Sequence, residues 1–291
     1  MASAVPLPTA PPAWDTVAIV GVGLIGGSVG RALLERGLAN HVVGVGRRTT
    51  SLRAAKKVGA VTATTMDLAR GVSRANLVVI CTPVEQIAAQ ALVAMNHAPA
   101  GALITDAGST KQQIVAEVEK KLPTGGRFVG SHPMAGSEKS GPGEAREDLF
   151  VGRAVIVTPT KKTPAADTEA VGEFWAALGA RVFMMTPEAH DRAVAGTSHL
   201  PHLISAMLAA VTRSEDAPLI AGGWLDTTRV AGGDPELWRQ ILQTNNQQVL
   251  AALAQFEKQL TSARRALERG DGARLAKLLA QGKAVRDALG N

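Results

Sequence analysis

The chain has 291 residues and a net charge of +6, and 46% of its residues are hydrophobic but only 3% are aromatic, with no tyrosine. Without tyrosine, no phenol can serve as a general acid, which excludes the reductases that work through a Tyr-x-x-x-Lys pair. The single cysteine excludes a disulfide within the chain, and the length predicts two domains.

The N-terminal residues 1–14, MASAVPLPTAPPAW, are rich in proline and alanine and predict a disordered tail without the features of a signal peptide. No run of about 18 apolar residues occurs, so we expect no membrane contact and a cytoplasmic protein. Basic residues occur in pairs without interleaved aromatic residues. We therefore expect no nucleic-acid partner.

Between residues 15 and 186, short β-branched runs alternate with amphipathic segments. The predicted strands are 17–20, 41–45, 76–80, 102–106, 127–131, 154–158 and 180–185. The predicted helices are 24–37, 50–58, 84–96, 110–121 and 165–178. Strands that are apolar on both faces and separated by helices are typical of a sheet covered on both sides. The sequence therefore predicts an α/β domain with a doubly wound, mainly parallel sheet.

Residues 187–291 contain no strand pattern and predict successive helices, including the stretches 235–269 and 272–289. A helical domain of this size cannot bury all of its apolar surface against one sheet domain. We therefore expect a homodimer that forms through this second domain.

A glycine-rich segment, GVGLIGGS at 21–28, joins the first predicted strand to the first predicted helix. In this pattern Gly21 permits a tight turn, Gly23 lets a pyrophosphate approach the backbone, and Gly26 lets the helix pack closely on the strand. The motif predicts a dinucleotide cofactor, with Leu24 and Ile25 of the same loop among the cofactor-binding residues.

The second strand ends in GVGRRTT at 44–50, with Gly46 where an acidic residue would bind the ribose hydroxyls of NAD. Arg47, Arg48 and Thr49 instead offer donors to a 2′-phosphate. The sequence therefore favours NADP over NAD. The alternative is that these arginines are only solvent-exposed surface residues.

Later strand ends supply further polar residues, because ligands of open α/β sheets bind at the carboxyl ends of the strands. Thr82 and Pro83 follow the strand 76–80 and are predicted cofactor contacts. His132 follows the strand 127–131, beside a proline and near glycines, and is the candidate base. The alternative is a structural histidine bonded to the backbone.

Four motifs in order carry a family resemblance: DAGSTK at 106–111, HPMAGSEKSG at 132–141, GTSHLPHLISAML at 196–208 and DTTRVAGGDPELW at 226–238. Together they resemble the prephenate/arogenate dehydrogenases of tyrosine biosynthesis, over residues 16 to about 260. The resemblance implies a Rossmann-like domain followed by an all-helical dimerisation domain. It also implies oxidative decarboxylation of prephenate, arogenate or both, with hydride transfer to NAD(P)+.

The resemblance assigns roles to single residues. His132 would take the proton of the substrate 4-hydroxyl as hydride leaves, and Ser109 would orient it. Arg229 would hold a substrate carboxylate in its planar fork. The other substrate-binding residues would be Ser137, Glu138, Ser198, His199, His202 and Asp226. For Glu138 a salt-bridged surface position is the alternative, and for Asp226 a packing role.

Other functions remain as alternatives. His199 and His202 lie three residues apart, but no nearby Cys, Asp or Glu completes a ligand set, so no metal is expected. β-Hydroxyacid dehydrogenases also join a Rossmann domain to a helical domain, but they carry a catalytic lysine where this chain has histidines. A non-catalytic dinucleotide sensor would not need His132, Ser109 and Arg229 together.

Overall fold

The computed structural model describes residues 14–136 and 141–290. Trp14, expected in the tail, is instead the first residue of strand β1, where it pairs with Ala39 of the neighbouring strand. The rest of the predicted tail lies outside the described residues.

The first part of the chain alternates strands and helices, as predicted. Its strands are β1 (Trp14–Val20), β2 (Ala39–Val45), β3 (Ala63–Thr65), β4 (Leu77–Ile80), β5 (Leu103–Asp106), β6 (Arg127–Pro133), β7 (Ala154–Thr158) and β8 (Arg181–Met184). Its helices are α1 (Leu24–Glu35), α2 (Thr49–Lys57), α3 (Leu68–Val72), α4 (Val84–His97), α5 (Gln112–Lys120), the 3-10 turn η1 (Pro142–Glu144) and α6 (Ala165–Ala177). The short elements β3 and α3 were not predicted.

The strands form one sheet in the order β3-β2-β1-β4-β5-β6-β7-β8. The strands from β1 to β6 are all parallel, whereas β7 runs antiparallel to β6 and parallel to β8. The predicted doubly wound, mainly parallel sheet is therefore confirmed. The order reverses between β1 and β4, where open α/β sheets bind their ligands at the carboxyl edge.

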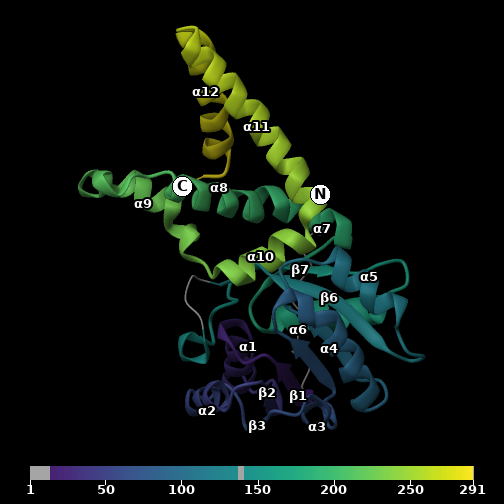
Figure 1. Ribbon diagram of the computed structural model, residues 1–291. Helices are drawn as coiled ribbons and strands as arrows, with labels where there is room; N and C mark the ends of the chain where they lie inside the picture. Colours follow the sequence, from purple (N-terminus) through teal and green to yellow (C-terminus); the bar gives the residue numbers. More distant parts are fainter. Residues whose placement is uncertain (1–13, 137–140, 291) are drawn as a thin grey trace.

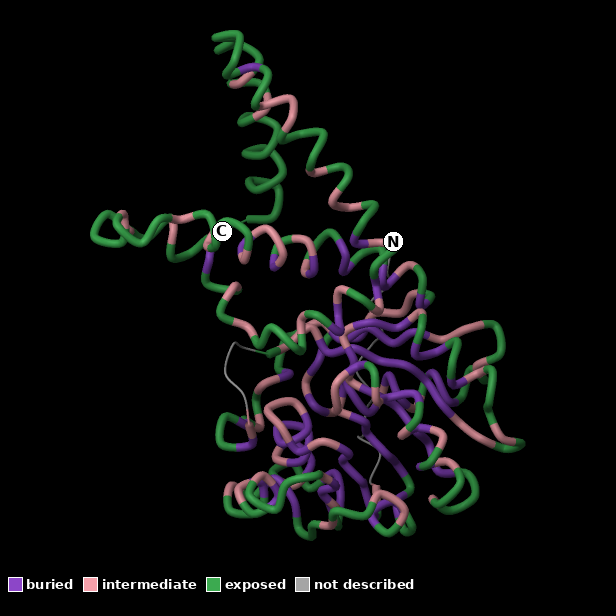
Figure 2. The backbone as a smooth tube through the Cα atoms, in the orientation of Figure 1, coloured by how far each residue is buried: buried purple, intermediate pink, exposed green. Residues whose placement is uncertain are grey.

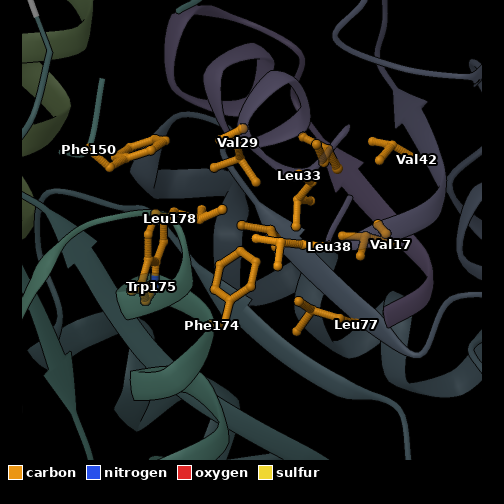
Figure 3. Packing of buried hydrophobic residues seen from close by; sticks show 14 of the residues in the cluster. Val17, Val29, Leu33, Leu38, Val42, Leu77, Phe150, Phe174, Trp175 and Leu178 are labelled. Atoms are coloured by element: carbon orange, nitrogen blue, oxygen red, sulfur yellow. The ribbon is translucent and has the colours of Figure 1, made fainter. Parts of the chain in front are cut away.

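Helices cover both faces of the sheet (Figure 1). One buried cluster joins the sheet to α1, α2 and α6, and Figure 3 shows Val29 and Leu33 of α1 above Phe174 and Trp175 of α6, with Leu178 and Leu38 between them. A second cluster joins the opposite face to α3, α4 and α5. Burial of these apolar side chains, worth about 25 cal/mol per Å², holds the three layers together.

The described residues after β8 contain helices and no strand. They are α7 (Pro187–Val194), the π turn η2 (Ala195–His199), α8 (Leu200–Ala210), η3 (Ser214–Leu219), α9 (Gly222–Thr228), η4 (Arg229–Gly232), α10 (Pro235–Thr244), α11 (Asn246–Glu268) and α12 (Gly272–Ala288). The predicted all-helical character of this part is confirmed. None of the described helices is long and apolar enough to cross a membrane.

The helical part rests on the carboxyl edge of the sheet through α7 and α10, which contact α5 and α4. The Thr110 and Thr244 hydroxyl oxygens lie 3.0 Å apart across this contact, and Arg239 pairs with Glu85 at 3.3 Å. Beyond it, α11 and α12 form a hairpin that projects away from the body, as Figure 1 shows. In Figure 2 this hairpin is mostly exposed, whereas the sheet is buried.

Candidate active site

The turn between β1 and α1 is shaped by its glycines. Gly21 has a φ of +95°, and a Cβ there would lie 2.7 Å from the carbonyl oxygen of Cys81. At Gly26 a Cβ would lie 2.1 Å from the carbonyl oxygen of Gly21, so only glycine lets α1 approach β1 this closely. At Gly23 a Cβ would meet no atom within 4 Å. The turn thus leaves open space beside the first turn of α1, which suits a pyrophosphate.

The ends of the neighbouring strands flank this space. Arg47, Arg48 and Thr49 follow β2 and are exposed, with no acidic side chain among them. After β4, Thr82 is half-buried and donates a hydrogen bond to Gln90 Oε1 at 2.6 Å, and Pro83 precedes the first residue of α4. These positions surround the glycine turn at the point where the strand order reverses. The cradle therefore has the shape and polarity for a dinucleotide.

A fully buried ion pair fixes the ends of β5 and β6. Lys111 Nζ contacts Asp106 Oδ2 and donates a 2.9 Å hydrogen bond to the carbonyl oxygen of Ser131. Asp106 also accepts hydrogen bonds from the backbone N–H groups of Gly108, at 2.8 Å, and Ser131, at 3.1 Å. A buried charge pair is tolerated when its other hydrogen-bonding positions are filled in this way. The network holds the residue that follows Ser131, which is His132.

His132 lies in β6 and contacts a second histidine from α7. Its Nδ1 is 2.8 Å from His190 Nε2, and His190 Nδ1 is 2.7 Å from Asp191 Oδ1. Helix α7 begins here because Thr186 caps it, accepting from the Ala189 N–H at 3.2 Å, with Pro187 in the first turn. This start places His190 and Asp191 beside the end of β6.

Two further histidines line the same region. His199 ends the π turn η2, and its Nδ1 lies 3.1 Å from Asn245 Nδ2. His202 stacks on Trp238, with ring centroids 3.5 Å apart and an interplanar angle of 10°. Both histidines are buried, and His199 Nε2 and His202 Nδ1 have no hydrogen-bond partner among the residues that the structure describes. Unpaired buried polar atoms are rare, so both point to a polar ligand or water.

Burial keeps these histidines neutral at pH 7. It is the main reason that the pKa of His132 lies well below 6.5, with smaller contributions from His190, Lys111 and His199. Burial also lowers the pKa of His199 to about 4, and it lowers the pKa of His190 despite the adjacent Asp191 carboxylate. A neutral imidazole can accept a proton, which a protonated one cannot.

The remaining predicted residues lie around this cluster. Ser109 is half-buried in the loop after β5, and Ser198 is half-buried within η2. Asp226 in α9 and Arg229 at the start of η4 are exposed, on a segment that packs against α8. Ser137 and Glu138 lie outside the described residues.

The sequence interpretation did not identify four polar residues of the site, namely Lys111, His190, Asp191 and Asn245. Lys111 was visible as the last residue of DAGSTK. His190 and Asp191 form an adjacent pair in the first helix after the sheet domain, which is a usable signal. Asn245 gave no signal, because its role depends on the tertiary contact with α7.

The described residues contain no group of three or more His, Cys, Asp or Glu side chains placed to hold a metal ion. A dinucleotide cradle next to a buried, neutral histidine is instead an arrangement for moving a proton while a hydride leaves the same substrate.

Comparison with known proteins gives matches along most of the chain. The model of the prephenate dehydrogenase nucleotide-binding domain matches residues 29–184, and that of the dimerization domain matches residues 186–281. Prephenate dehydrogenase of Bacillus subtilis is 35% identical over 94% of this chain and 76% of its own length. Cyclohexadienyl dehydrogenase of Zymomonas mobilis is 33% identical, over 94% and 95%. The crystal structure of prephenate dehydrogenase from A. aeolicus with hydroxyphenyl propionate and NAD+ is 32% identical, with a TM-score of 0.86, covering 94% of this chain and 98% of that one.

Proposed function

The chain belongs to the prephenate dehydrogenase family, and from this we propose which of its residues carry the reaction. The enzyme is an NAD(P)-dependent dehydrogenase, and its reaction is the oxidative decarboxylation of prephenate or arogenate. The substrate loses a hydride from the ring carbon that bears the hydroxyl group, and then carbon dioxide, and its ring becomes aromatic. When bound, the nicotinamide ring supplies the hydride acceptor.

The observation that carries the assignment is the buried, neutral His132 at the end of β6. His132 accepts the proton of the substrate 4-hydroxyl while hydride leaves the ring carbon that bears this hydroxyl. Loss of carbon dioxide then returns an electron pair to the ring, and the ring oxygen takes the proton back. The side chain therefore acts first as a base and then as an acid, with no net release of a proton.

Other residues bind and orient the substrate in this proposal. Ser109 orients the reacting groups from the loop after β5, and Arg229 binds a carboxylate of the substrate. His199 Nε2 and His202 Nδ1, which are buried and have no partner among the described residues, offer polar contacts to substrate oxygen atoms. Ser137, Glu138, Ser198 and Asp226 complete the proposed substrate site.

NADP is the proposed cofactor. The cradle of Gly21, Gly23 and Gly26, with Leu24 and Ile25, fits a dinucleotide, and Thr82 and Pro83 extend the contact surface along it. At the end of β2 no carboxylate would repel a 2′-phosphate, and the exposed side chains of Arg47, Arg48 and Thr49 supply donors.

We also propose that the enzyme is a homodimer joined through its helical domain. Residues 186–281 match a dimerization domain, and α11 exposes Leu250, Leu260 and Leu267 to solvent at 58–65%. These three leucines lie within about 100° of one another around the helix axis. Such an exposed apolar face is typical of an interface.

Steady-state kinetics with two substrates and two cofactors test the proposed function. We expect reduction of the cofactor with prephenate, arogenate or both, and a higher kcat/KM for NADP+ than for NAD+. A preference for NAD+ would refute the cofactor assignment and leave the reaction intact. If the dinucleotide binds but neither substrate is turned over, the chain is a dinucleotide sensor instead.

A further inference from the structure

Three buried side chains form a continuous row of hydrogen bonds behind the proposed base. His132 Nδ1 contacts His190 Nε2 at 2.8 Å, and His190 Nδ1 contacts Asp191 Oδ1 at 2.7 Å. All three residues are buried, His190 and Asp191 almost completely. We call Asp191, His190 and His132 the relay.

The carboxylate end of the relay fixes where its protons lie. Asp191 accepts hydrogen bonds from the backbone N–H groups of Lys111, at 2.8 Å, and Gln112, at 2.9 Å. Two backbone donors, one to each carboxyl oxygen, favour the ionised carboxylate, which only accepts. His190 Nδ1 therefore carries a proton and donates it to Asp191.

The same logic extends to His132. Burial keeps His190 neutral, so a proton on its Nδ1 leaves its Nε2 as a hydrogen-bond acceptor. His132 Nδ1 must then carry the proton of the second hydrogen bond. In a neutral imidazole only one nitrogen carries a proton, so the lone pair of His132 lies on Nε2.

We propose that Asp191 and His190 are positioning residues that hold the proton of His132 on Nδ1 and leave Nε2 to accept the substrate proton. The proposal deepens the proposed role of His132 and rests on it. In the proton transfer, the substrate O–H bond breaks and a bond between that proton and His132 Nε2 forms. The proton returns from Nε2 to the ring oxygen after carbon dioxide has left.

The relay stays connected when His132 takes up the substrate proton. The imidazolium keeps its Nδ1–H bond to His190, whose other nitrogen is bonded to the Asp191 carboxylate. The other charged or titratable groups around the relay are Lys111, paired with Asp106, and His199. Lys111 and His199 disfavour a positive charge on His132, whereas the carboxylates of Asp191 and Asp106 favour one on the neighbouring His190.

Hydrogen bonds to both the side chain and the backbone of Asp191 hold it in place. Its side chain accepts from the first amides of α5, where the helix dipole favours a negative charge. Its backbone carbonyl oxygen accepts a 2.8 Å hydrogen bond from Asn245 Nδ2. Contacts from two other elements therefore fix the carboxylate relative to β6.

Nuclear magnetic resonance of protein labelled with 15N-histidine tests the proton positions directly. The chain has six histidines, so His132→Asn and His190→Gln suffice to assign the two signals. At pH 7 we expect protonated Nδ1 and unprotonated Nε2 for both His132 and His190. A proton on Nε2 of His132 would overturn the proposal. This readout needs no turnover, so it distinguishes failure of the relay from failure of the proposed reaction.

Kinetics of His190 variants test the consequence. His190→Phe removes the acceptor, and we expect kcat to fall by about 10²–10⁴-fold while KM and the affinity for dinucleotide change little. His190→Gln restores a carbonyl acceptor near the position of Nε2, and it should recover at least about tenfold of this loss. The control is His97→Phe at an exposed position. Unchanged kcat in folded His190→Phe, or equal loss in both His190 variants, would contradict the relay.

Discussion

His199 and His132 are both neutral histidines, yet their neighbours give them opposite hydrogen-bonding characters. The Asn245 amide must direct its nitrogen toward the Asp191 carbonyl oxygen, since that oxygen only accepts. The same nitrogen faces His199 Nδ1, which must therefore accept. His199 then carries its proton on Nε2, a buried atom without a partner in the described part of the chain. His199 is thus a donor suited to a substrate oxygen, while His132 is an acceptor in the proposed relay.

Replacing His132 should affect chemistry more than binding. His132→Asn removes the proton acceptor but leaves the substrate and cofactor contacts in place. We expect kcat to fall by about 10²–10⁴-fold, with KM changed by less than about threefold. Initial rates over a range of substrate concentrations measure both constants. His97→Asn, at an exposed helix end, is the matched control, and an unchanged kcat in His132→Asn would exclude the role of base.

Burial of His199 should make the fold sensitive to acid. The unfolded chain takes up a proton at this position near pH 6.5, whereas the folded chain does so only near pH 4. Stability from this group is therefore complete above pH 6.5 and is lost as the pH falls toward 4. Between pH 7 and pH 5, the free energy of unfolding should decrease by about 2 kcal/mol on account of His199 alone.

Urea unfolding at pH 7 and pH 5 measures this contribution. We expect His199→Phe to lose less stability than the native chain over this interval, by about 2 kcal/mol. His41→Phe, at an exposed position of β2, should behave like the native chain. Identical losses in the native chain and in His199→Phe would show that His199 does not titrate as its burial indicates.

At the scale of elements, different glycines of the β1–α1 turn serve helix packing and cofactor binding. Gly26 lies where α1 touches β1, whereas Gly23 faces open space. Gly26→Ala should destabilise the fold by about 1–3 kcal/mol, because the added methyl group collides with the Gly21 carbonyl. Gly23→Ala should change the free energy of unfolding by less than about 1 kcal/mol, yet weaken dinucleotide binding by about tenfold or more.

Urea unfolding and dinucleotide titration distinguish these two effects. Gly282→Ala, in the exposed helix α12, is the control, since a Cβ there also meets open space. Unchanged dinucleotide affinity in Gly23→Ala would contradict the assignment of this space to the pyrophosphate.

The predictable elements are those with a strong apolar period. The parallel strands of the core are apolar on both faces, so their positions followed from the residues. Strand β3 has three largely exposed residues and α3 has five residues, so neither shows a periodic pattern. The stretch 235–269, predicted as helical, is divided at Asn245 into α10 and α11. The side chain of Asn245 is hydrogen-bonded to the Asp191 backbone and lies against His199.

The site residues that belong to a sequence motif could be predicted. Those that reach the site only through tertiary contacts could not. The glycine turn and His132 lie at strand ends, which the sequence marks. His190 reaches His132 only because α7 packs beside α5, and no local pattern shows that contact. The direction of β7 was also hidden, because apolar strands show the same pattern whichever way they run.

At the scale of the whole molecule, the two halves of the helical part occupy different positions relative to the sheet. Its first half, with α7 and α10, covers the carboxyl edge of the sheet and supplies His190, His199 and Trp238 to the site. Its last helices, α11 and α12, extend away from that edge (Figure 1). Apolar side chains on this extension contribute nothing to the buried clusters of the sheet domain.

The dimer can be tested on α11. Leu260→Glu combined with Leu267→Glu should give a monomer, because two charges would be buried in the interface without partners. Light scattering after gel filtration measures the mass, with Lys258→Glu on the other side of the helix as the control. A monomeric native chain would exclude the proposed homodimer.

The π turn η2 sets the rotation of everything that follows it. An α-helix turns about 100° per residue, so His190 and His199, nine positions apart, would face opposite sides of a regular helix. The wider turn at Ala195–His199 accommodates an extra residue. It reduces the angle between His190 and His199 around the helix axis by about 100°, which brings the two rings toward the same side. Deletion of one residue here, such as Gly196, would leave His190 and His199 eight positions apart, about 80° around a regular helix, so we expect both rings to stay on the same side. The π turn therefore lets this segment hold one residue more than a regular helix would, without changing the side that its histidines face.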